Sequence, residues 1–97
     1  MRIIALRTLR EFWETHASAR DSLQVWYDHV CQADWKSPED LARDYGRDAL
    51  LSDQRAVFNF KGNQFRLVVR INYQHRLVFI HFIGSHAEYN RIDATKI

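Results

Sequence analysis

Hydrophobic and polar positions change their period near the middle of the chain. Up to Asp53, apolar residues recur at the three- and four-residue spacing of amphipathic helices. After Asp53 they alternate with polar residues, which is the period of half-buried strands. The pattern therefore predicts mostly helices first and a sheet afterwards.

The first half predicts one short strand and three helices. We expect an apolar edge strand over 2–5 and helices over 8–14, over 18–34 with Ser18 as its N-cap, and from Ser37 to Gly46. Serine followed by proline and carboxylates is typical of a helix start, and glycine of a helix end. Cys31 falls in the apolar pattern of the second helix, so we interpret it as a small buried group.

The second half predicts strands over 56–60, 65–73 and 77–83 and a last helix over 86–92. Short polar connections between the strands are typical of hairpins. The order β-α-α-α-β-β-β-α over 1–97 indicates a single α+β domain. A short N-terminal strand and helices would pack on a small antiparallel sheet, followed by a short C-terminal helix.

The hairpins also predict which side chains share a face. Pairing Phe60 with Phe65 places Asn59 beside Arg66, and pairing Tyr73 with Arg76 brings the last two strands into register. The expected core face then carries Ala56, Phe58, Phe60, Phe65, Leu67, Val69, Ile71, Val78, Ile80 and Phe82. The opposite, open face collects Asn59, Lys61, Arg66, Val68, Arg70, Phe79 and His81, and His86 and Tyr89 follow the last strand.

Composition and charge narrow the class of protein. The chain is 46% hydrophobic, with three glycines and one proline, which indicates a compact fold. A single cysteine permits no internal disulfide and fits a reducing cytoplasm. No signal peptide or membrane-spanning run is expected. Charge is uneven: residues 1–53 hold seven Lys/Arg against ten Asp/Glu, and 54–97 hold seven against two. A basic, strand-rich half is a plausible nucleic-acid surface.

The residues on the open face suit RNA cleavage without a metal. Lysine and arginine stabilise charge on phosphorus, histidine moves protons near neutral pH, and aromatic rings stack bases. The histidines and Cys31 show no metal-ligand spacing, so neither a metal nor another cofactor is expected.

Each candidate also has a purely structural interpretation. Arg66 and Arg70 fit a solvated face, Lys61 fits a turn and His81 fits sheet packing. His86 could cap the last helix, and Tyr89 could cover the core.

Three segments carry a family resemblance. "VFNFKGNQFRLVVRINY", "VFIHFIGSHAEYNRID" and "CQADWKSPEDL" resemble the HigB toxins, a branch of the RelE/ParE superfamily of bacterial toxin–antitoxin systems. The resemblance implies a ribosome-dependent mRNA endonuclease that acts in the ribosomal A site. It also implies inhibition by a HigA-type antitoxin with a helix-turn-helix domain.

The resemblance further implies roles for single residues. Arg66 would bind the scissile phosphate, His86 would be the acid or base, Lys61 a charge stabiliser or base, and Tyr89 would orient the base or sugar. Because they share the open face with Arg66, Asn59, Arg70 and His81 are expected to contact the RNA backbone. His86 stands where RelE itself carries arginine, so His86 and Lys61 compete for the role of general base.

A second hypothesis is a binding module without catalysis. ParE relatives share this fold and target gyrase, and a toxin without activity could persist as an antitoxin-binding co-repressor. Cleaved mRNA with 5′-hydroxyl ends would separate the two hypotheses.

Overall fold

Four strands form one sheet in the order β1-β4-β3-β2 in the computed structural model, which describes residues 1–60 and 64–97. They are β1 (Arg2–Ile4), β2 (Arg55–Phe60), β3 (Phe65–Asn72) and β4 (Leu77–Ser85). β2, β3 and β4 pair antiparallel, whereas β1 runs parallel to β4. The predicted antiparallel sheet is therefore confirmed for β2, β3 and β4, and the parallel β1 makes the four-stranded sheet mixed. The helices that follow β1 return the chain to β2, which runs in the same direction as β1 and β4. A parallel pair requires such a long connection.

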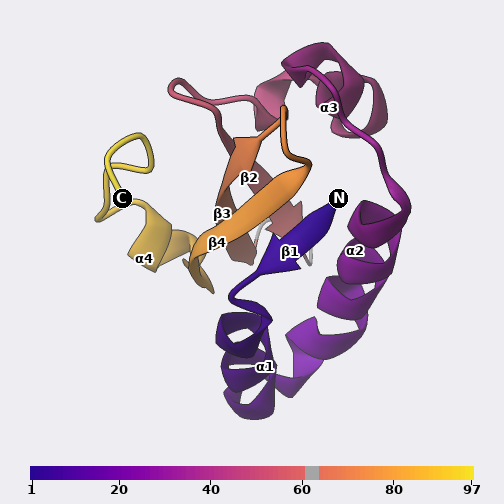
Figure 1. Cartoon of the computed structure of the whole chain (residues 1–97). Helices are drawn as coiled ribbons and strands as arrows, with labels where there is room; N and C mark the ends of the chain where they lie inside the picture. The colour runs from indigo at the N-terminus through magenta and orange to yellow at the C-terminus, as the bar shows by residue number, and fades with distance from the viewer. Residues whose placement is uncertain (61–63) are drawn as a thin grey trace.

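The helices are α1 (Leu6–Thr15), α2 (Arg20–Gln32), α3 (Pro38–Tyr45) and α4 (His86–Tyr89), with short 3₁₀ turns at Ala17–Ala19 and Arg47–Ala49. This confirms the predicted order of elements (Figure 1). Ser18 lies inside the first 3₁₀ turn and so does not cap α2. Pro38 begins α3, and Gly46 ends it with a φ of 89° that favours glycine. No helix in the described ranges is long and apolar enough to cross a bilayer.

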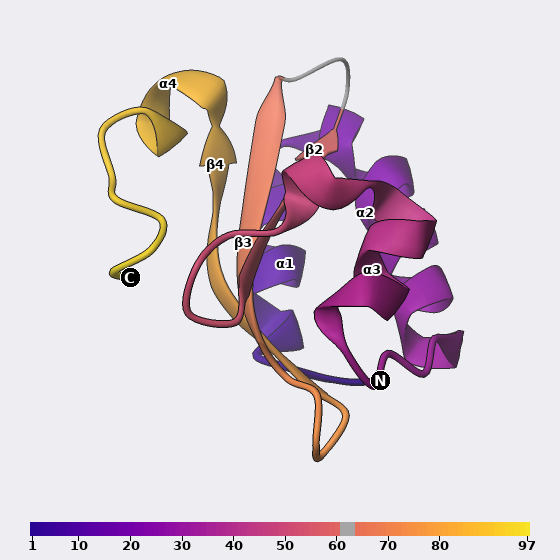
Figure 2. The same ribbon diagram turned by 90° about the horizontal axis from the view of Figure 1, so that it is seen from above.

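The sheet lies between two unequal layers. Figure 2 shows it edge-on, with α1, α2 and α3 on one side and α4 with the C-terminal segment on the other. The helical side holds the main core, where Leu9, Leu23 and Leu41 meet Leu67 and Ile71 of β3. These side chains are fully buried, which confirms the inward face predicted for β3.

A bulge in β4 changes which face its last residues occupy. Val69 pairs with Ile80 as predicted, but Val68 pairs with Phe82, so His81 is the extra residue. Phe82 therefore packs on the side opposite the main core, and Ile83 packs against the core instead. The prediction of Phe82 as a core-face residue is wrong for this reason.

The second face of the sheet is partly covered. Val57 and Val68 are buried together with Ala94 of the C-terminal segment, and the side chains packed around them are Leu51, Phe82, Tyr89 and Ile97. The prediction of one continuous open face is therefore wrong at its centre. The C-terminal segment shields apolar residues there that the strand pattern would leave in water.

Cys31 is exposed at the end of α2, so its predicted burial is wrong. It lies one residue beyond the buried Val30 on the helix, which turns it toward solvent.

Candidate active site

The turn from β4 into α4 fixes the position of His86. The Ser85 hydroxyl accepts a hydrogen bond from the Glu88 backbone N–H (3.1 Å), and the Glu88 carboxylate accepts one from the Ser85 N–H (3.1 Å). This is a complete capping box, with His86 as the first helical residue. The bonds from Ser85 hold the pKa of Glu88 below its ordinary value. Ser85, and not His86, is therefore the helix cap.

His86 is also tied to the start of β3. Its backbone N–H donates to the Gln64 carbonyl oxygen (3.0 Å), while its side chain is exposed. The Arg66 Nε donates a hydrogen bond to His86 Nδ1 across 3.1 Å. The arrangement therefore holds the imidazole of His86 against a guanidinium group.

Tyr89 completes the group formed by Arg66 and His86. The Arg66 guanidinium carbon lies 4.9 Å from the centroid of the Tyr89 ring, within the range of a cation–π contact. The same ring packs on the buried cluster of Val57, Val68 and Ala94. Tyr89 therefore positions Arg66 and anchors α4 on the sheet. Arg66 is half-exposed, and no described side chain or carbonyl accepts a hydrogen bond from its two terminal nitrogens.

Asn59 lies next to Arg66 as the hairpin register predicts. The two residues pair directly across β2 and β3, and Asn59 is exposed. Directly paired residues in antiparallel strands point to the same face. Lys61, the remaining residue predicted to be catalytic, lies outside the described residues.

Arg70 and His81 lie in a different part of the same side of the sheet. Together with Gln54 and Phe79, they line a hollow of about 300 Å³. The His81 Nδ1 lies 2.7 Å from the Ile97 carbonyl oxygen, and the buried Val68 separates Arg70 from Arg66 along β3. The structure thus joins Asn59, Arg66, His86 and Tyr89 in one site and leaves Arg70 and His81 in a neighbouring one.

Arg55 is a structural residue that the sequence analysis missed. It is only 8% exposed, and its guanidinium donates two hydrogen bonds to the Ile97 carbonyl oxygen (3.0 and 2.7 Å) and one to the Asp53 carboxylate (2.6 Å). These bonds hold the C-terminal segment over the sheet. Strand parity could have indicated Arg55, because it shares a face with Val57 and Asn59. The capping box was also readable, since Ser85 and Glu88 have the required spacing.

The site holds the groups needed to bind and activate a phosphodiester. Arg66 offers N–H donors with the spacing of phosphate oxygens, and His86 offers an imidazole, a common general acid or base in catalysis. Within residues 1–60 and 64–97, no group of three or more His, Cys, Asp or Glu side chains gathers as metal ligands would.

A comparison with protein families identifies the family of the chain. A family model described as HigB_toxin, the RelE-like toxic component of a toxin–antitoxin system, matches residues 19–92. No curated protein matches the chain significantly. Because the family model covers most of the chain, the protein belongs to the HigB family of RelE-like toxins, the toxic components of toxin–antitoxin systems.

Proposed function

We propose that this toxin is a metal-independent mRNA endonuclease that acts on the ribosome in the cytoplasm. The observation that supports the proposal most strongly is the contact of Arg66 with both His86 and Tyr89 at an exposed end of the sheet. In RNA cleavage through the 2′-hydroxyl, a cation can stabilise charge on the phosphate and an imidazole can move protons. An aromatic ring can stack on a base. Membership of a toxin family supplies the biological setting.

In the proposed reaction, the mRNA 2′-oxygen attacks its own phosphorus. The 2′-hydroxyl loses its proton, the new O–P bond forms, and the bond to the 5′-oxygen breaks. The departing 5′-oxygen takes up a proton, so the products end in a 2′,3′-cyclic phosphate and a 5′-hydroxyl. Negative charge builds on the phosphoryl oxygens on the way, and the terminal nitrogens of Arg66 stabilise it.

The hydrogen bond from Arg66 to Nδ1 favours His86 as the proton acceptor. In the free toxin, the lone pair of His86 Nδ1 accepts the hydrogen bond from Arg66. When a phosphate draws the guanidinium away, Nδ1 becomes free to accept the 2′-hydroxyl proton. Lys61 is the competing base, or a second charge stabiliser.

The remaining residues would hold the RNA. Tyr89 would orient a base or sugar, and Asn59 lies beside Arg66 to contact the backbone. Arg70 and His81 would bind RNA further along the strand. Arg70 lies four positions after Arg66 on β3, about 13 Å along the strand.

Single-turnover cleavage of mRNA on programmed ribosomes tests this proposal. We expect Arg66→Ala to lower the cleavage rate about 10²-fold, a typical loss for an electrostatic stabiliser. Arg20→Ala, which removes an exposed arginine of α2, is the matched control and should cleave at the wild-type rate. Arg66→Ala cleaving like the control would exclude the assignment. Growth arrest with intact mRNA would instead favour gyrase, another target or a non-catalytic binding role.

A further inference from the structure

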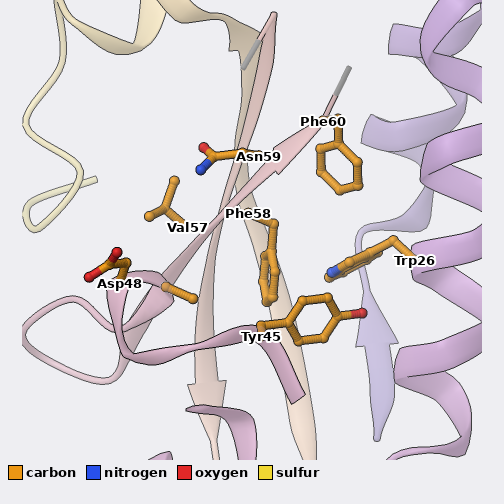
Figure 3. Close-up of a pocket in the computed structure, with 8 residues that line it drawn as sticks. Trp26, Tyr45, Asp48, Val57, Phe58, Asn59 and Phe60 are labelled. Atoms are coloured by element: carbon orange, nitrogen blue, oxygen red, sulfur yellow. The ribbon is translucent and has the colours of Figure 1, made fainter. Parts of the chain in front are cut away.

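A second hollow lies along the outer edge of β2, next to the helices and away from the contact of Arg66 with His86. Its volume is about 200 Å³, and its walls come from α2, the end of α3, the second 3₁₀ turn and β2. Figure 3 shows the rings of Trp26, Tyr45 and Phe58 around it, with Asp48 at the rim. The hollow is apolar inside and polar at its mouth, which is typical of a site for an apolar side chain.

One polar atom in this hollow lacks a partner. Trp26 is 3% exposed, and its indole N–H has no hydrogen-bond acceptor among the described residues. Figure 3 shows the indole nitrogen turned toward the side chains of β2. The Phe58 ring lies edge-on at 5.3 Å, and an N–H directed at a ring is a weak substitute for a carbonyl acceptor. A buried donor of this kind is unusual in a native fold and calls for an acceptor.

The Tyr45 hydroxyl differs from the indole in this respect. It lies 2.8 Å from His29 Nδ1 and is therefore already paired. The ring of Tyr45 forms part of the wall of the hollow. Its centroid lies 4.9 Å from the centroid of the Phe58 ring. Trp26 thus supplies the free donor, and the neighbouring rings supply apolar walls.

The hollow follows the outer edge of β2, where a bridge between Leu50 and Ala56 covers residues 55–57 and leaves the backbone groups of Asn59 open among the described residues. β2 is the last strand of the sheet. The Ile71 N–H donates to the Gln54 carbonyl oxygen (2.8 Å), so in the antiparallel alternation residues 54, 56, 58 and 60 bond toward β3. The backbone N–H and C=O groups of residues 55, 57 and 59 therefore point away from β3. The bond from the Leu51 N–H to the Arg55 carbonyl oxygen agrees with this. In the part of the chain described, no backbone group bonds to the outward N–H and C=O of Asn59.

Charge at the rim indicates the kind of partner. Asp48 is exposed and forms no ion pair within the described ranges, whereas the nearby Arg47 is paired with Glu39 at 2.7 Å. An unpaired carboxylate beside an apolar hollow favours a partner that carries a basic residue next to an apolar one.

We infer that this hollow and the outer edge of β2 bind an extended segment of the antitoxin. The segment inserts one apolar side chain, presents a backbone carbonyl to the Trp26 indole N–H and places a lysine or arginine against Asp48. A toxin of this family has an antitoxin partner, and the inference depends on that membership and not on RNA cleavage. Asn59 both lines the hollow and pairs with Arg66. A strand added to β2 would therefore lie about 10 Å from β3, two strand spacings, and close to the active site.

The ¹⁵N–¹H spectrum of the tryptophan indoles tests the inference in the wild-type toxin. On addition of the purified cognate antitoxin, we expect the Trp26 indole proton to move downfield and to exchange more slowly with water. Trp35, whose indole already donates to Asp44 (2.9 Å), is the internal reference and should change little. An antitoxin complex that leaves the Trp26 signal unchanged would overturn the inference.

Two charge reversals test the rim by calorimetry. Asp48→Lys should weaken antitoxin binding about tenfold, and Asp28→Lys, an exposed position of α2 outside this hollow, should change it less than twofold. Equal affinities for the two variants would overturn the inference. A toxin that dimerises alone, with the Trp26 signal already shifted, would show that a second copy of the chain occupies the site and would also overturn it.

Discussion

Arg66 and His86 lie 20 residues apart in the chain, yet Arg66 Nε donates a hydrogen bond to His86 Nδ1 across 3.1 Å. The hairpin of β2 and β3 sets the position of Arg66, and the capping box after β4 sets that of His86. The contact holds the imidazole beside the guanidinium, whose two terminal nitrogens have no hydrogen-bond acceptor among the described residues. In our proposal, a phosphate completes this arrangement.

The capping box should make stability depend on pH through Glu88. Its pKa is lower in the folded chain than its usual value near 4.5. The stabilisation that the ionised Glu88 carboxylate gives the fold is therefore fully present above that usual value. It is lost as pH falls through the folded-state pKa. We expect the difference in unfolding free energy between wild type and Glu88→Gln to be largest at neutral pH and to shrink toward acid. Urea titrations from pH 7 to pH 3 measure it, with the exposed Glu14→Gln as the charge-matched control. A difference that grows toward acid would contradict this account.

Loss of the cap should affect both stability and cleavage. Ser85→Ala removes the acceptor for the Glu88 N–H, and loss of an N-cap serine costs about 1 kcal/mol. Because His86 follows directly, we also expect slower mRNA cleavage. Ser85→Asp keeps an acceptor at the cap and should retain more of the wild-type stability. Equal stability of Ser85→Ala and wild type in urea titrations would show that the cap contributes nothing.

Arg55 should control the C-terminal segment. Arg55→Met keeps much of the aliphatic stem and removes the bonds to Ile97 and Asp53. Hydrogen bonds from a charged group contribute about 1.5–3 kcal/mol each when buried. We expect proteolysis within residues 90–97 to become faster by about tenfold or more, because the segment opens more often. Unchanged protection of this segment would contradict the role we assign to Arg55.

A side chain at Gly84 should clash with the ring of Phe82. A Cβ at Gly84 would lie 2.7 Å from the Cζ of Phe82, and Gly84 is the register partner of Arg66. We expect Gly84→Ala to lower the free energy of unfolding by about 1–3 kcal/mol, as overpacking does. The same change made in a Phe82→Leu background should cost less, because the ring is absent. Equal costs in both backgrounds, measured by urea titration, would exclude this clash.

The resemblance of three segments predicted the family, and the hydrophobic pattern predicted the order of elements and most of the inward-facing residues. Period-two alternation indicated that Arg66 faces away from the core, and the short hairpin fixed Asn59 beside it. The bulge at His81 was not predictable, because the alternation in 77–83 fits an unbroken strand equally well. The C-terminal segment was also missed, since Ala94 and Ile97 are too widely spaced among polar residues to form a pattern. Parallel pairing of β1 depends on the path of three helices, which local periodicity does not encode.

A double-mutant cycle of Arg66→Ala and His86→Ala, measured by single-turnover cleavage on programmed ribosomes, tests the central proposal most directly. If the two side chains act as one catalytic unit, each single variant loses about 10²-fold or more. The double variant should then lose little beyond the worse single variant. Full wild-type cleavage by either single variant, or a double loss equal to the product of the two single losses, would contradict the account.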